Sequence, residues 1–149
     1  MISNDINDLK IVEINDIKMI DMVISKCDDA FQLPITKRVE YLQLLQKYST
    51  KGCFAYAVND DVLGYIAFYI NNKTSAYISL IAVNPDYQNN HVGGALLRYC
   101  EKKAKINNIP YVRLEVKKNN LKAFKFYKAN DYELEGDKDQ NSLYMKKKI

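Results

Sequence analysis

The stretch QNNHVGGAL, Gln88–Leu96, holds the residues of this chain that are best suited to bind an anion. Two glycines, Gly93 and Gly94, stand where a helical run begins, although a glycine costs a helix about 1 kcal/mol relative to alanine. The first N–H groups of a helix are unpaired and partly positive, and glycine lets an anion approach them closely. The spacing favours a phosphate-binding loop. Close packing of the helix start on a sheet explains the glycines equally well.

His91, the only histidine, lies in the same stretch and is the first candidate for acid–base chemistry. The three cysteines, Cys27, Cys53 and Cys100, are widely spaced and form no CxxC pair, which argues against a zinc or dithiol site. We therefore expect no metal and three reduced thiols. The chain also lacks GxGxxG and the GxxxxGK signature of P-loop proteins, so neither a dinucleotide nor a nucleoside triphosphate is favoured.

The first third of the chain is expected to form one strand and two helices. Residues 9–14 read as a strand, and Asp16 can cap a helix that follows it. Thr36 can cap a second helix after the loop CDDAFQLP. The apolar residues expected to face the core are Ile17, Ile20, Ile24 and Cys27 in the first helix and Val39, Leu42 and Leu45 in the second.

The middle of the chain predicts an antiparallel meander that leads into the Gln88–Leu96 stretch. Residues 53–58, 62–70 and 75–83 read as strands, joined by the turns NDD and NNKT. Each strand is rich in β-branched or aromatic residues, which suit a pleated surface.

The last third alternates between helix and strand. The helical run VGGALLRYCEKKAKINN, the strand PYVRLEV, the helix NLKAFKFYKA and a closing strand pair follow one another. An antiparallel front half followed by a β-α-β-α-β back half predicts an α/β fold with a mixed sheet and helices on both faces. The length suits a single domain over residues 1–149.

The segment IAVNPDYQNNHVGGALL resembles the acyl-CoA motif of the GCN5-related N-acetyltransferase (GNAT) superfamily. In that family a strand and a Pro-aromatic turn precede the pattern Q/R-x-x-G-x-G/A, whose three places are held here by Gln88, His91 and Gly93. The resemblance implies that backbone amides of residues 89–94 hold the pyrophosphate of CoA. It also implies that the main chain of residues 81–83 pairs with the pantetheine arm as an added strand would.

The segment NLKAFKFYKANDY resembles a second motif of the family, N-x-x-A-x-x-x-Y-x-x-x-G-F, with Asn120, Ala123, Tyr127 and Tyr132 in place. Asp131 holds the glycine position, and aspartate tolerates a left-handed helix end better than most residues. The element order fits over nearly the whole chain, so the resemblance implies the GNAT acyl-CoA N-acyltransferase fold. The residues that it implies for cofactor binding are Ile81, Ala82, Val83, Gln88, Asn89, Asn90, His91, Val92, Gly93, Gly94, Asn120, Ala123 and Tyr127.

His91 departs from the family pattern, which usually has glycine at its position. Histidine enters the left-handed backbone region more readily than most residues, and its ring can donate a hydrogen bond to a phosphate. The alternative is a ring that points into solvent. We therefore expect His91 to tune CoA binding and to have no acid–base role.

The strand YVRLEVK alternates, which places Glu115 on the face opposite to its apolar residues. A strand covered on both faces should not carry charge, so this side is expected to line a cleft or to be exposed. In related acetyltransferases a glutamate five residues before the helix asparagine can act as a base, often through water, and Glu115 stands five residues before Asn120. A surface ion pair with Arg113 is the alternative.

Tyr127 matches the tyrosine that the family often uses as general acid toward the CoA sulfur, and a phenol is a donor at neutral pH. The alternative is a tyrosine that merely packs on its helix beside Phe124 and Phe126. The backbone N–H of Val83 or of a neighbour is the implied donor to the thioester oxygen, because in the family this strand splays from the next one. The resemblance thus implies Glu115 and Tyr127 as catalytic residues.

By resemblance, the acceptor is walled by the loop after the first helix, the strand SAYISL and the last hairpin. In that position Asp28 would attract a cationic amine, and Phe31 and Tyr77 would pack against the rest of the acceptor. A helix end followed by a turn is the simpler interpretation of Asp28 and Asp29.

Together these features predict an acetyl-CoA-dependent N-acetyltransferase that moves the acetyl group directly to a primary amine of a small molecule, such as an amino sugar or an amino-acid derivative. Acetylation of a protein N-terminus or lysine stays open, because the LEV…N…A…Y spacing also resembles ribosomal-protein N-acetyltransferases. A non-catalytic acyl-CoA-binding module is the third hypothesis.

Charge and hydropathy limit the expected partners. The net charge of +4 is spread through the last third of the chain and forms no dense basic stripe, so we expect no nucleic acid. No apolar run approaches the roughly 18 residues of a membrane helix, and the first residues do not read as a secretory signal. We expect a cytoplasmic monomer or homodimer that binds no membrane.

Overall fold

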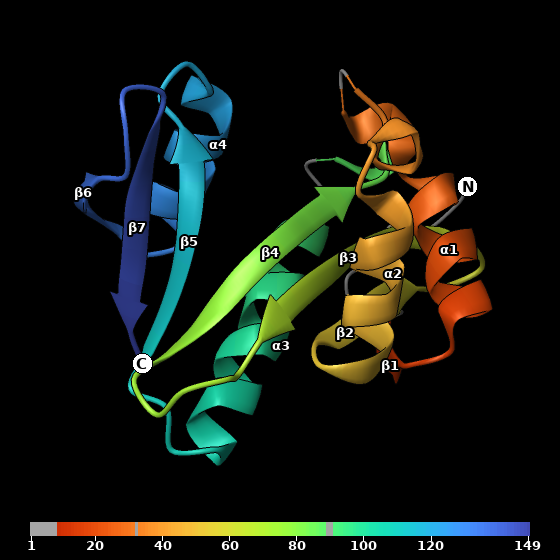
Figure 1. The fold of residues 1–149 in the computed structure, drawn as a ribbon, viewed down its shortest axis with the longest axis horizontal. Coiled ribbons are helices and arrows are strands. Elements are labelled where there is room, and N and C mark those ends of the chain that lie inside the picture. The colour runs from red at the N-terminus through yellow and green to blue at the C-terminus, as the bar shows by residue number, and fades with distance from the viewer. Residues whose placement is uncertain (1–8, 32, 89–90) are drawn as a thin grey trace.

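The computed structural model describes residues 9–31, 33–88 and 91–149, which form one sheet flanked by helices (Figure 1). The strands are β1 (Lys10–Ile14), β2 (Cys53–Val58), β3 (Val62–Tyr69), β4 (Ser75–Val83), β5 (Tyr111–Lys117), β6 (Glu133–Asp137) and β7 (Ser142–Lys148). The helices are α1 (Ile17–Lys26), α2 (Tyr41–Thr50), α3 (Val92–Ile106) and α4 (Leu121–Ala129), with 3-10 turns η2 (Asp28–Ala30), η3 (Ile35–Lys37) and η4 (Pro85–Tyr87). The predicted α/β class is confirmed.

The sheet has seven strands in the order β1-β2-β3-β4-β5-β7-β6. All neighbouring pairs are antiparallel except β4 and β5, which run parallel. The strands β2, β3 and β4 form the predicted meander, and β1 extends it as a fourth antiparallel strand. The helix α3 makes the crossover that a parallel pair requires. The closing hairpin folds back so that β7, and not β6, pairs with β5.

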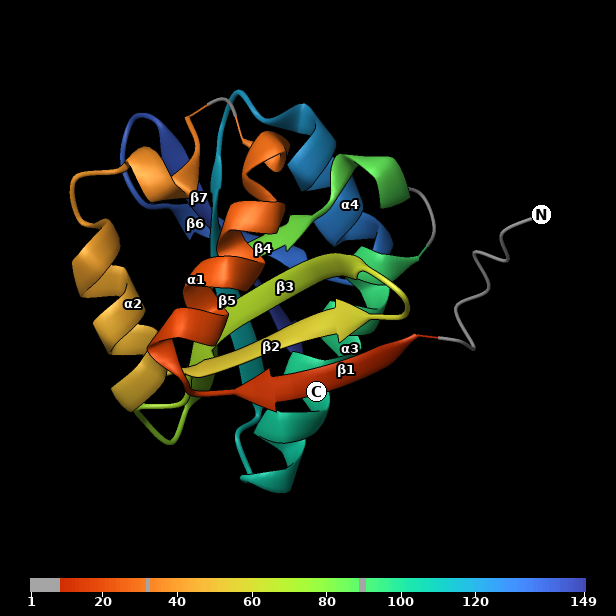
Figure 2. The ribbon, with the colours of Figure 1, turned by 90° about the vertical axis from the view of Figure 1, so that its right-hand side faces the viewer.

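Helices cover both faces of the sheet. The helices α1 and α2 lie on one face and α3 and α4 on the other (Figure 2). Tyr48 and Phe54 are buried in the core beneath α1 and α2, whereas Leu96 and Leu114 are buried in the core beneath α3 and α4. The whole of β3 is buried, as expected for a strand covered on both faces.

The first helix begins where the sequence predicts. The side chain of Asp16 accepts hydrogen bonds from the N–H groups of Lys18 and Met19, at 2.9 and 3.0 Å. This contact satisfies two of the unpaired donors at the helix start. Of the four predicted core positions only Ile17 is exposed, because it stands at the end of α1, in the first helical position.

The predicted start of the second helix was wrong. Thr36 caps no α-helix, because it lies inside η3 and its hydroxyl donates to the carboxylate of Asp28. The helix α2 begins only at Tyr41. This later start leaves Leu45 as the one buried residue among the three predicted to face the core. The hydrogen bond from Thr36 to Asp28 therefore takes the place of the helix-capping contact that the local sequence predicts.

A bulge divides β4 into two halves with different neighbours. The register with β3 skips Ser79, and pairing with β5 covers only the first half, Ser75–Ile78 against Tyr111–Leu114. A bulge bends its strand and increases the local twist. Beyond it, β4 diverges from β5, as the widening gap between the two ribbons in Figure 1 shows. The second half of β4 thus has a strand neighbour on one side only.

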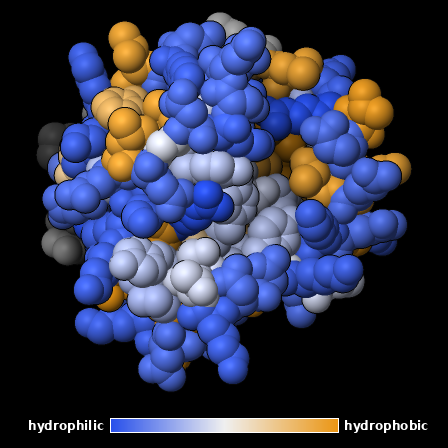
Figure 3. All heavy atoms as spheres, turned by 60° about the vertical axis from the view of Figure 1, so that its left-hand side comes forward, coloured by the Kyte–Doolittle hydropathy of each residue, from blue (hydrophilic) through white to orange (hydrophobic). Residues whose placement is uncertain are grey.

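The side of the molecule that carries β6 and β7 is mostly hydrophilic, with hydrophobic residues in small separate patches (Figure 3). Part of the positive charge of this region is paired within the molecule, since Lys147 pairs with the buried Glu101 at 2.9 Å and the more exposed Lys146 pairs with Glu135 at 3.6 Å. Among the described residues, no helix has the length and apolar character needed to cross a membrane.

Candidate active site

A cleft of about 1000 Å³ lies where β4 and β5 diverge. Its walls come from the loop between α1 and α2 on one face of the sheet and from the starts of α3 and α4 on the other. The predicted site residues that line it are Phe31, Tyr77, Ile81, Ala82, Val83, Gln88, His91, Val92, Gly93, Gly94, Glu115, Asn120, Ala123 and Tyr127. Asn89 and Asn90 lie outside the described residues. The fold therefore gathers most of the predicted site into one continuous space.

The second half of β4 presents free backbone groups to this cleft. Directly after the strand, the N–H of Asn84 donates to the carbonyl of Leu63, on the next strand β3, at 2.8 Å. Because N–H groups alternate in direction along an antiparallel strand, those of Ile81 and Val83 point away from β3 and into the gap. An extended ligand can pair with them as an added strand.

His91 precedes α3 in the left-handed conformation, with φ 62° and ψ 14°. Glycine adopts this conformation freely and histidine tolerates it, which explains how a histidine stands where the family pattern has glycine. The side chain is exposed and makes no capping hydrogen bond. Nearby, Gln88 accepts a hydrogen bond from Lys122 of α4 at 3.0 Å, which joins the loop to that helix.

The two glycines at the start of α3 have different surroundings. A Cβ atom at Gly93 would lie 2.8 Å from Cζ of Phe126 in α4, closer than real Cβ contacts come. A Cβ atom at Gly94 would meet only Oδ1 of Asn130, at an ordinary 3.5 Å. Close packing therefore accounts for Gly93. It does not account for Gly94, whose backbone faces the cleft.

The helix α4 begins with a side-chain cap and carries Tyr127 into the cleft wall. Oδ1 of Asn120 accepts from the N–H of Ala123 at 3.1 Å. The ring of Tyr127 packs between Phe126 and Tyr132, with centroid distances of 5.2 and 5.9 Å. Burial raises the pKa of the Tyr127 phenol, so the group is protonated at neutral pH. It can therefore act as a proton donor at the cleft.

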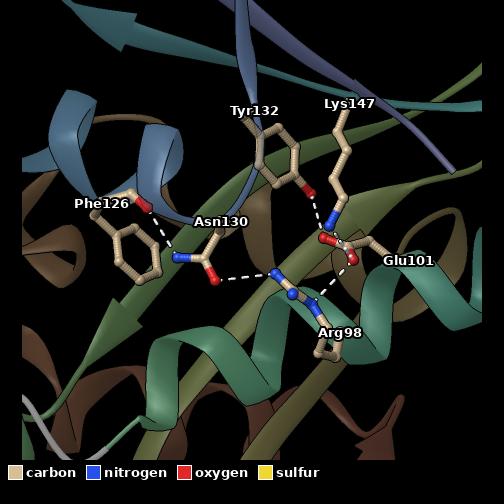
Figure 4. A network of polar contacts seen from close by, with 6 residues as sticks. All are labelled: Arg98, Glu101, Phe126, Asn130, Tyr132 and Lys147. Atoms are coloured by element: carbon tan, nitrogen blue, oxygen red, sulfur yellow. Dashed lines mark hydrogen bonds and ion pairs between the residues drawn. The ribbon is translucent and has the colours of Figure 1, made fainter.

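A cluster of ion pairs around the buried carboxylate of Glu101 ties α3 to α4 and β7 (Figure 4). Glu101 pairs with Arg98 at 3.0 Å and with Lys147 at 2.9 Å, and it accepts a hydrogen bond from the Tyr132 phenol at 2.9 Å. Arg98 also donates to Oδ1 of Asn130 at 3.0 Å. The amide nitrogen of Asn130 donates to the α4 backbone at 2.8 Å. The buried carboxylate is thus fully satisfied, and Asn130, a lining residue, is held at both ends.

Glu115 lies on the α1–α2 face of β5, since the apolar residues of that strand belong to the opposite core. Its carboxylate accepts a hydrogen bond from Lys138 of the closing hairpin at 2.8 Å. The alternative pairing with Arg113 was wrong, because Arg113 contacts Glu135 at 2.7 Å. The hydrogen bond from Lys138 lowers the pKa of Glu115, and partial burial opposes that effect. The carboxylate is therefore ionised at neutral pH.

The acceptor side of the cleft holds two of the three residues predicted for it. Phe31 and Tyr77 line the cleft, and burial raises the pKa of the Tyr77 phenol. Asp28 is not among the lining residues. Its carboxylate instead accepts hydrogen bonds from the N–H of Ile35 at 3.0 Å and from the hydroxyl of Thr36, which fold the loop between α1 and α2.

Sequence reasoning missed three residues of this side. Arg38 and Ser79 line the cleft, and Lys138 donates a hydrogen bond to the carboxylate of Glu115. The Arg38 guanidinium lies 5.7 Å from the centroid of the Phe31 ring. No local pattern marks Arg38 or Ser79, because one depends on the course of a loop and the other on a bulge. Lys138 stands in the turn-rich segment GDKDQNS, which gives no indication of its partner.

The cysteines take no part in this site. Burial raises the pKa of Cys27 to about 12, and it also raises the pKa values of Cys53 and Cys100. The three thiols are therefore protonated at neutral pH and are poor nucleophiles. Within the described ranges, no three His, Cys, Asp or Glu side chains come together as a metal site would require.

Comparison with known families shows to which family the chain that forms this cleft belongs. Residues 20–132 match the sequence model of the acetyltransferase (GNAT) family, a span that includes both the loop and α4. The chain belongs to this family. It is therefore a GNAT N-acetyltransferase, as the two sequence motifs implied. No curated protein matches the chain.

Solved structures share the fold of this GNAT protein at low sequence identity. Ard1 from Thermoplasma volcanium has a TM-score of 0.77 and 23% identity, with 95% of this chain and 98% of that chain covered. The PaiA N-acetyltransferase from Thermoplasma acidophilum, solved with coenzyme A, has a TM-score of 0.73 and 22% identity, with 94% and 99% covered. A ribosomal-protein alanine N-acetyltransferase from Escherichia coli has a TM-score of 0.77 and 15% identity, with 95% and 94% covered.

In this GNAT protein the two candidate catalytic side chains reach the cleft from opposite faces of the sheet. Tyr127 comes from α4, on the face that also carries the glycines of α3. Glu115 comes from the face that carries Phe31 and Tyr77. The gap between β4 and β5 connects the two sides, so a group bound on one face can react with a group bound on the other.

The different surroundings of the two glycines lead to a stability prediction. Gly93→Ala is expected to be less stable than Gly94→Ala by about 1–3 kcal/mol, since only the first forces Phe126 to move. The helix-propensity gain is the same for both variants and cancels in the comparison. Urea unfolding of the two proteins measures the difference. Equal stabilities would contradict the packing explanation for Gly93.

Proposed function

We propose that this GNAT protein transfers the acetyl group of acetyl-CoA directly to a primary amine of a small molecule. The observation that carries the proposal is the cleft through the β4–β5 gap, with the ionised carboxylate of Glu115 on one face and the protonated phenol of Tyr127 on the other. Transfer to an amine needs a base beside the acceptor and an acid beside the leaving thiolate. The two faces supply one group each.

The start of α3 supports binding of the CoA pyrophosphate. The first backbone hydrogen bond into this helix runs from the N–H of Ala95 to the carbonyl of His91, at 3.1 Å. The N–H groups of Val92, Gly93 and Gly94 therefore have no partner inside the helix, and the helix dipole makes this end attractive to an anion. We assign the pyrophosphate to this position and the pantetheine arm to the free backbone of residues 81–83.

The proposed reaction begins when the acceptor ammonium gives a proton to Glu115, directly or through a water. The neutral amine attacks the carbonyl carbon of the thioester, and the N–H of Val83 donates to the oxygen as it gains negative charge. The carbon–sulfur bond breaks, and Tyr127 protonates the departing thiolate. The second proton of the amine nitrogen restores the phenol through solvent. The products are an acetamide, free CoA and one proton.

The acceptor wall favours a small molecule over a protein chain. Phe31 and Arg38, from the loop between α1 and α2, line the cleft together with Tyr77 and Glu115, so this loop narrows the acceptor end. An extended peptide needs an open groove at this point. The E. coli enzyme with a similar fold acts on a ribosomal protein, and a protein acceptor is therefore the second candidate.

Release of free thiol from acetyl-CoA, followed with a panel of small amines, amino sugars and peptides, tests this function. We expect release above the acceptor-free background with at least one class of small amine and a weaker response to peptides. Calorimetric titration with CoA is run on the same protein. CoA binding without release for any acceptor would instead identify a non-catalytic acyl-CoA-binding module. Absence of CoA binding would contradict the assignment of the α3 loop.

A further inference from the structure

Arg38 is placed to contact the acceptor and pairs with no Asp or Glu among the described residues. It follows η3 in the loop between α1 and α2, is half-buried and lines the cleft. Its guanidinium lies over the ring of Phe31, also a lining residue, at 5.7 Å from the centroid. A guanidinium stacked on an aromatic ring keeps its N–H donors free at the edge.

Apart from the exposed Lys117, which also lines the cleft, the other charges at the acceptor end are already paired. Glu115 pairs with Lys138 at 2.8 Å, and Arg113 pairs with Glu135 at 2.7 Å. The carboxylate of Asp28 is engaged by the backbone and hydroxyl of its own loop. Within the described part of the chain, no Asp or Glu lies within ion-pair distance of Arg38. The acceptor end therefore holds the paired carboxylate of Glu115 and the guanidinium of Arg38, whose charge is available to a ligand.

The positive charge of Arg38 acts on two buried phenols of the core beneath α1 and α2. Burial raises the pKa values of Tyr48 and Tyr65, and the positive charge of Arg38 opposes the rise in both. The phenol of Tyr48 is hydrogen-bonded to Ser79 at 2.8 Å, and Ser79 itself lines the cleft. Arg38 is half-buried and lines the same cleft as Glu115 and Ser79.

We infer that Arg38 binds a carboxylate of the acceptor, so that the acceptor is a zwitterionic amino acid whose ammonium faces Glu115. This inference rests on the proposed function and specifies its substrate class. A single unpaired guanidinium matches the single charge of a carboxylate and can bind it with two parallel hydrogen bonds. Lys138 contacts one oxygen of the Glu115 carboxylate, so the other oxygen can accept a hydrogen bond from the ammonium. Phe31 and Tyr77 then enclose the carbon skeleton between the two charged ends.

The test compares each of the twenty common L-amino acids with its carboxamide, which keeps the amine and removes the negative charge. Thiol release from acetyl-CoA is measured for the wild type, Arg38→Met and the control Lys37→Met, which alters an exposed cation of η3 outside the cleft lining. For the best amino acid we expect kcat/KM in the wild type to exceed that of the carboxamide by on the order of 30-fold. Arg38→Met should abolish this preference, mainly through KM, and Lys37→Met should keep it.

Several results would overturn the inference. The contact between Arg38 and a carboxylate is refuted if the wild type acetylates carboxamides as well as amino acids. It is also refuted if Arg38→Met loses both activities equally. Neither result contradicts the acetyltransferase function. If none of the amines causes thiol release above the background, the proposed function is refuted. In that case, calorimetric titration of the CoA-loaded protein with amino acids still decides about Arg38, because binding lost in Arg38→Met supports the contact and absence of binding refutes it. Matching circular dichroism melts confirm that the variants fold.

Discussion

Replacement of Tyr127 by phenylalanine is expected to lower kcat about 100-fold at neutral pH, while the affinity for CoA changes by less than about twofold. The change removes only the hydroxyl that we assign as the proton donor to the thiolate. The ring and its contacts with Phe126 and Tyr132 are kept, so the fold of α4 is preserved. Steady-state thiol release gives kcat, and calorimetric titration gives the affinity.

The control for this experiment is Tyr99→Phe. The Tyr99 hydroxyl donates to Glu13 at 3.0 Å and the residue does not line the cleft, so its loss should leave kcat unchanged. Because burial raises the pKa of Tyr127 above its ordinary value of 10.0, wild-type kcat should also show no alkaline decline below that pH. An unchanged kcat in Tyr127→Phe, or an equal loss of kcat in both variants, would contradict the role of Tyr127 as proton donor.

Replacement of Glu115 by glutamine is expected to lower kcat/KM about 100-fold at neutral pH. Glutamine has nearly the same shape and cannot accept the ammonium proton. Kinetics with the best acceptor of the panel measure the loss, and CoA titration checks that the donor side is intact. An unchanged kcat/KM would reduce Glu115 to a structural partner of Lys138.

The pairing with Lys138 adds a pH dependence whose sign is defined. Lys138 lowers the pKa of Glu115 below its ordinary 4.5, so the carboxylate stays ionised down to acid pH and the rise of kcat/KM near neutrality follows the acceptor ammonium. In Lys138→Met the lowering is lost and the pKa of Glu115 rises, so the further loss of kcat/KM that follows protonation of Glu115 at acid pH begins at a higher pH than in the wild type. The control is Lys118→Met, which breaks a 2.9 Å pair with Asp137 outside the cleft. The same shift in both variants would exclude a specific effect on Glu115.

Short-range patterns account for several local features of the fold and of the cleft. Asp16 and Asn120 cap their helices through contacts two or three residues away. His91 and Asp131 stand where the family patterns have glycine, and both adopt left-handed backbone, with φ 62° and 71°. The alternation in β5 correctly separated Glu115 from the apolar face of its strand. Such features depend on neighbours within one turn or one pleat, so the sequence displays them directly.

The acceptor side was predicted less well, because its geometry depends on contacts between distant segments. Thr36 is a good helix cap by local criteria, but the carboxylate of Asp28 binds it and delays α2 to Tyr41. Glu115 could be matched with its strand neighbour Arg113 from the sequence, whereas its partner Lys138 is brought to it by the return of β7 into the sheet.

By itself, the sequence determined the family, the order of the strands and helices, and the loop that we assign to the CoA pyrophosphate, since these are recorded in spacing and periodicity. Only the tertiary structure decided that the divergence of β4 from β5 begins at a bulge at Ser79, and that Arg38 enters the cleft without an acidic partner among the described residues. Strand divergence and loop position are set by packing across the sheet, and they determine which side chains the acceptor meets.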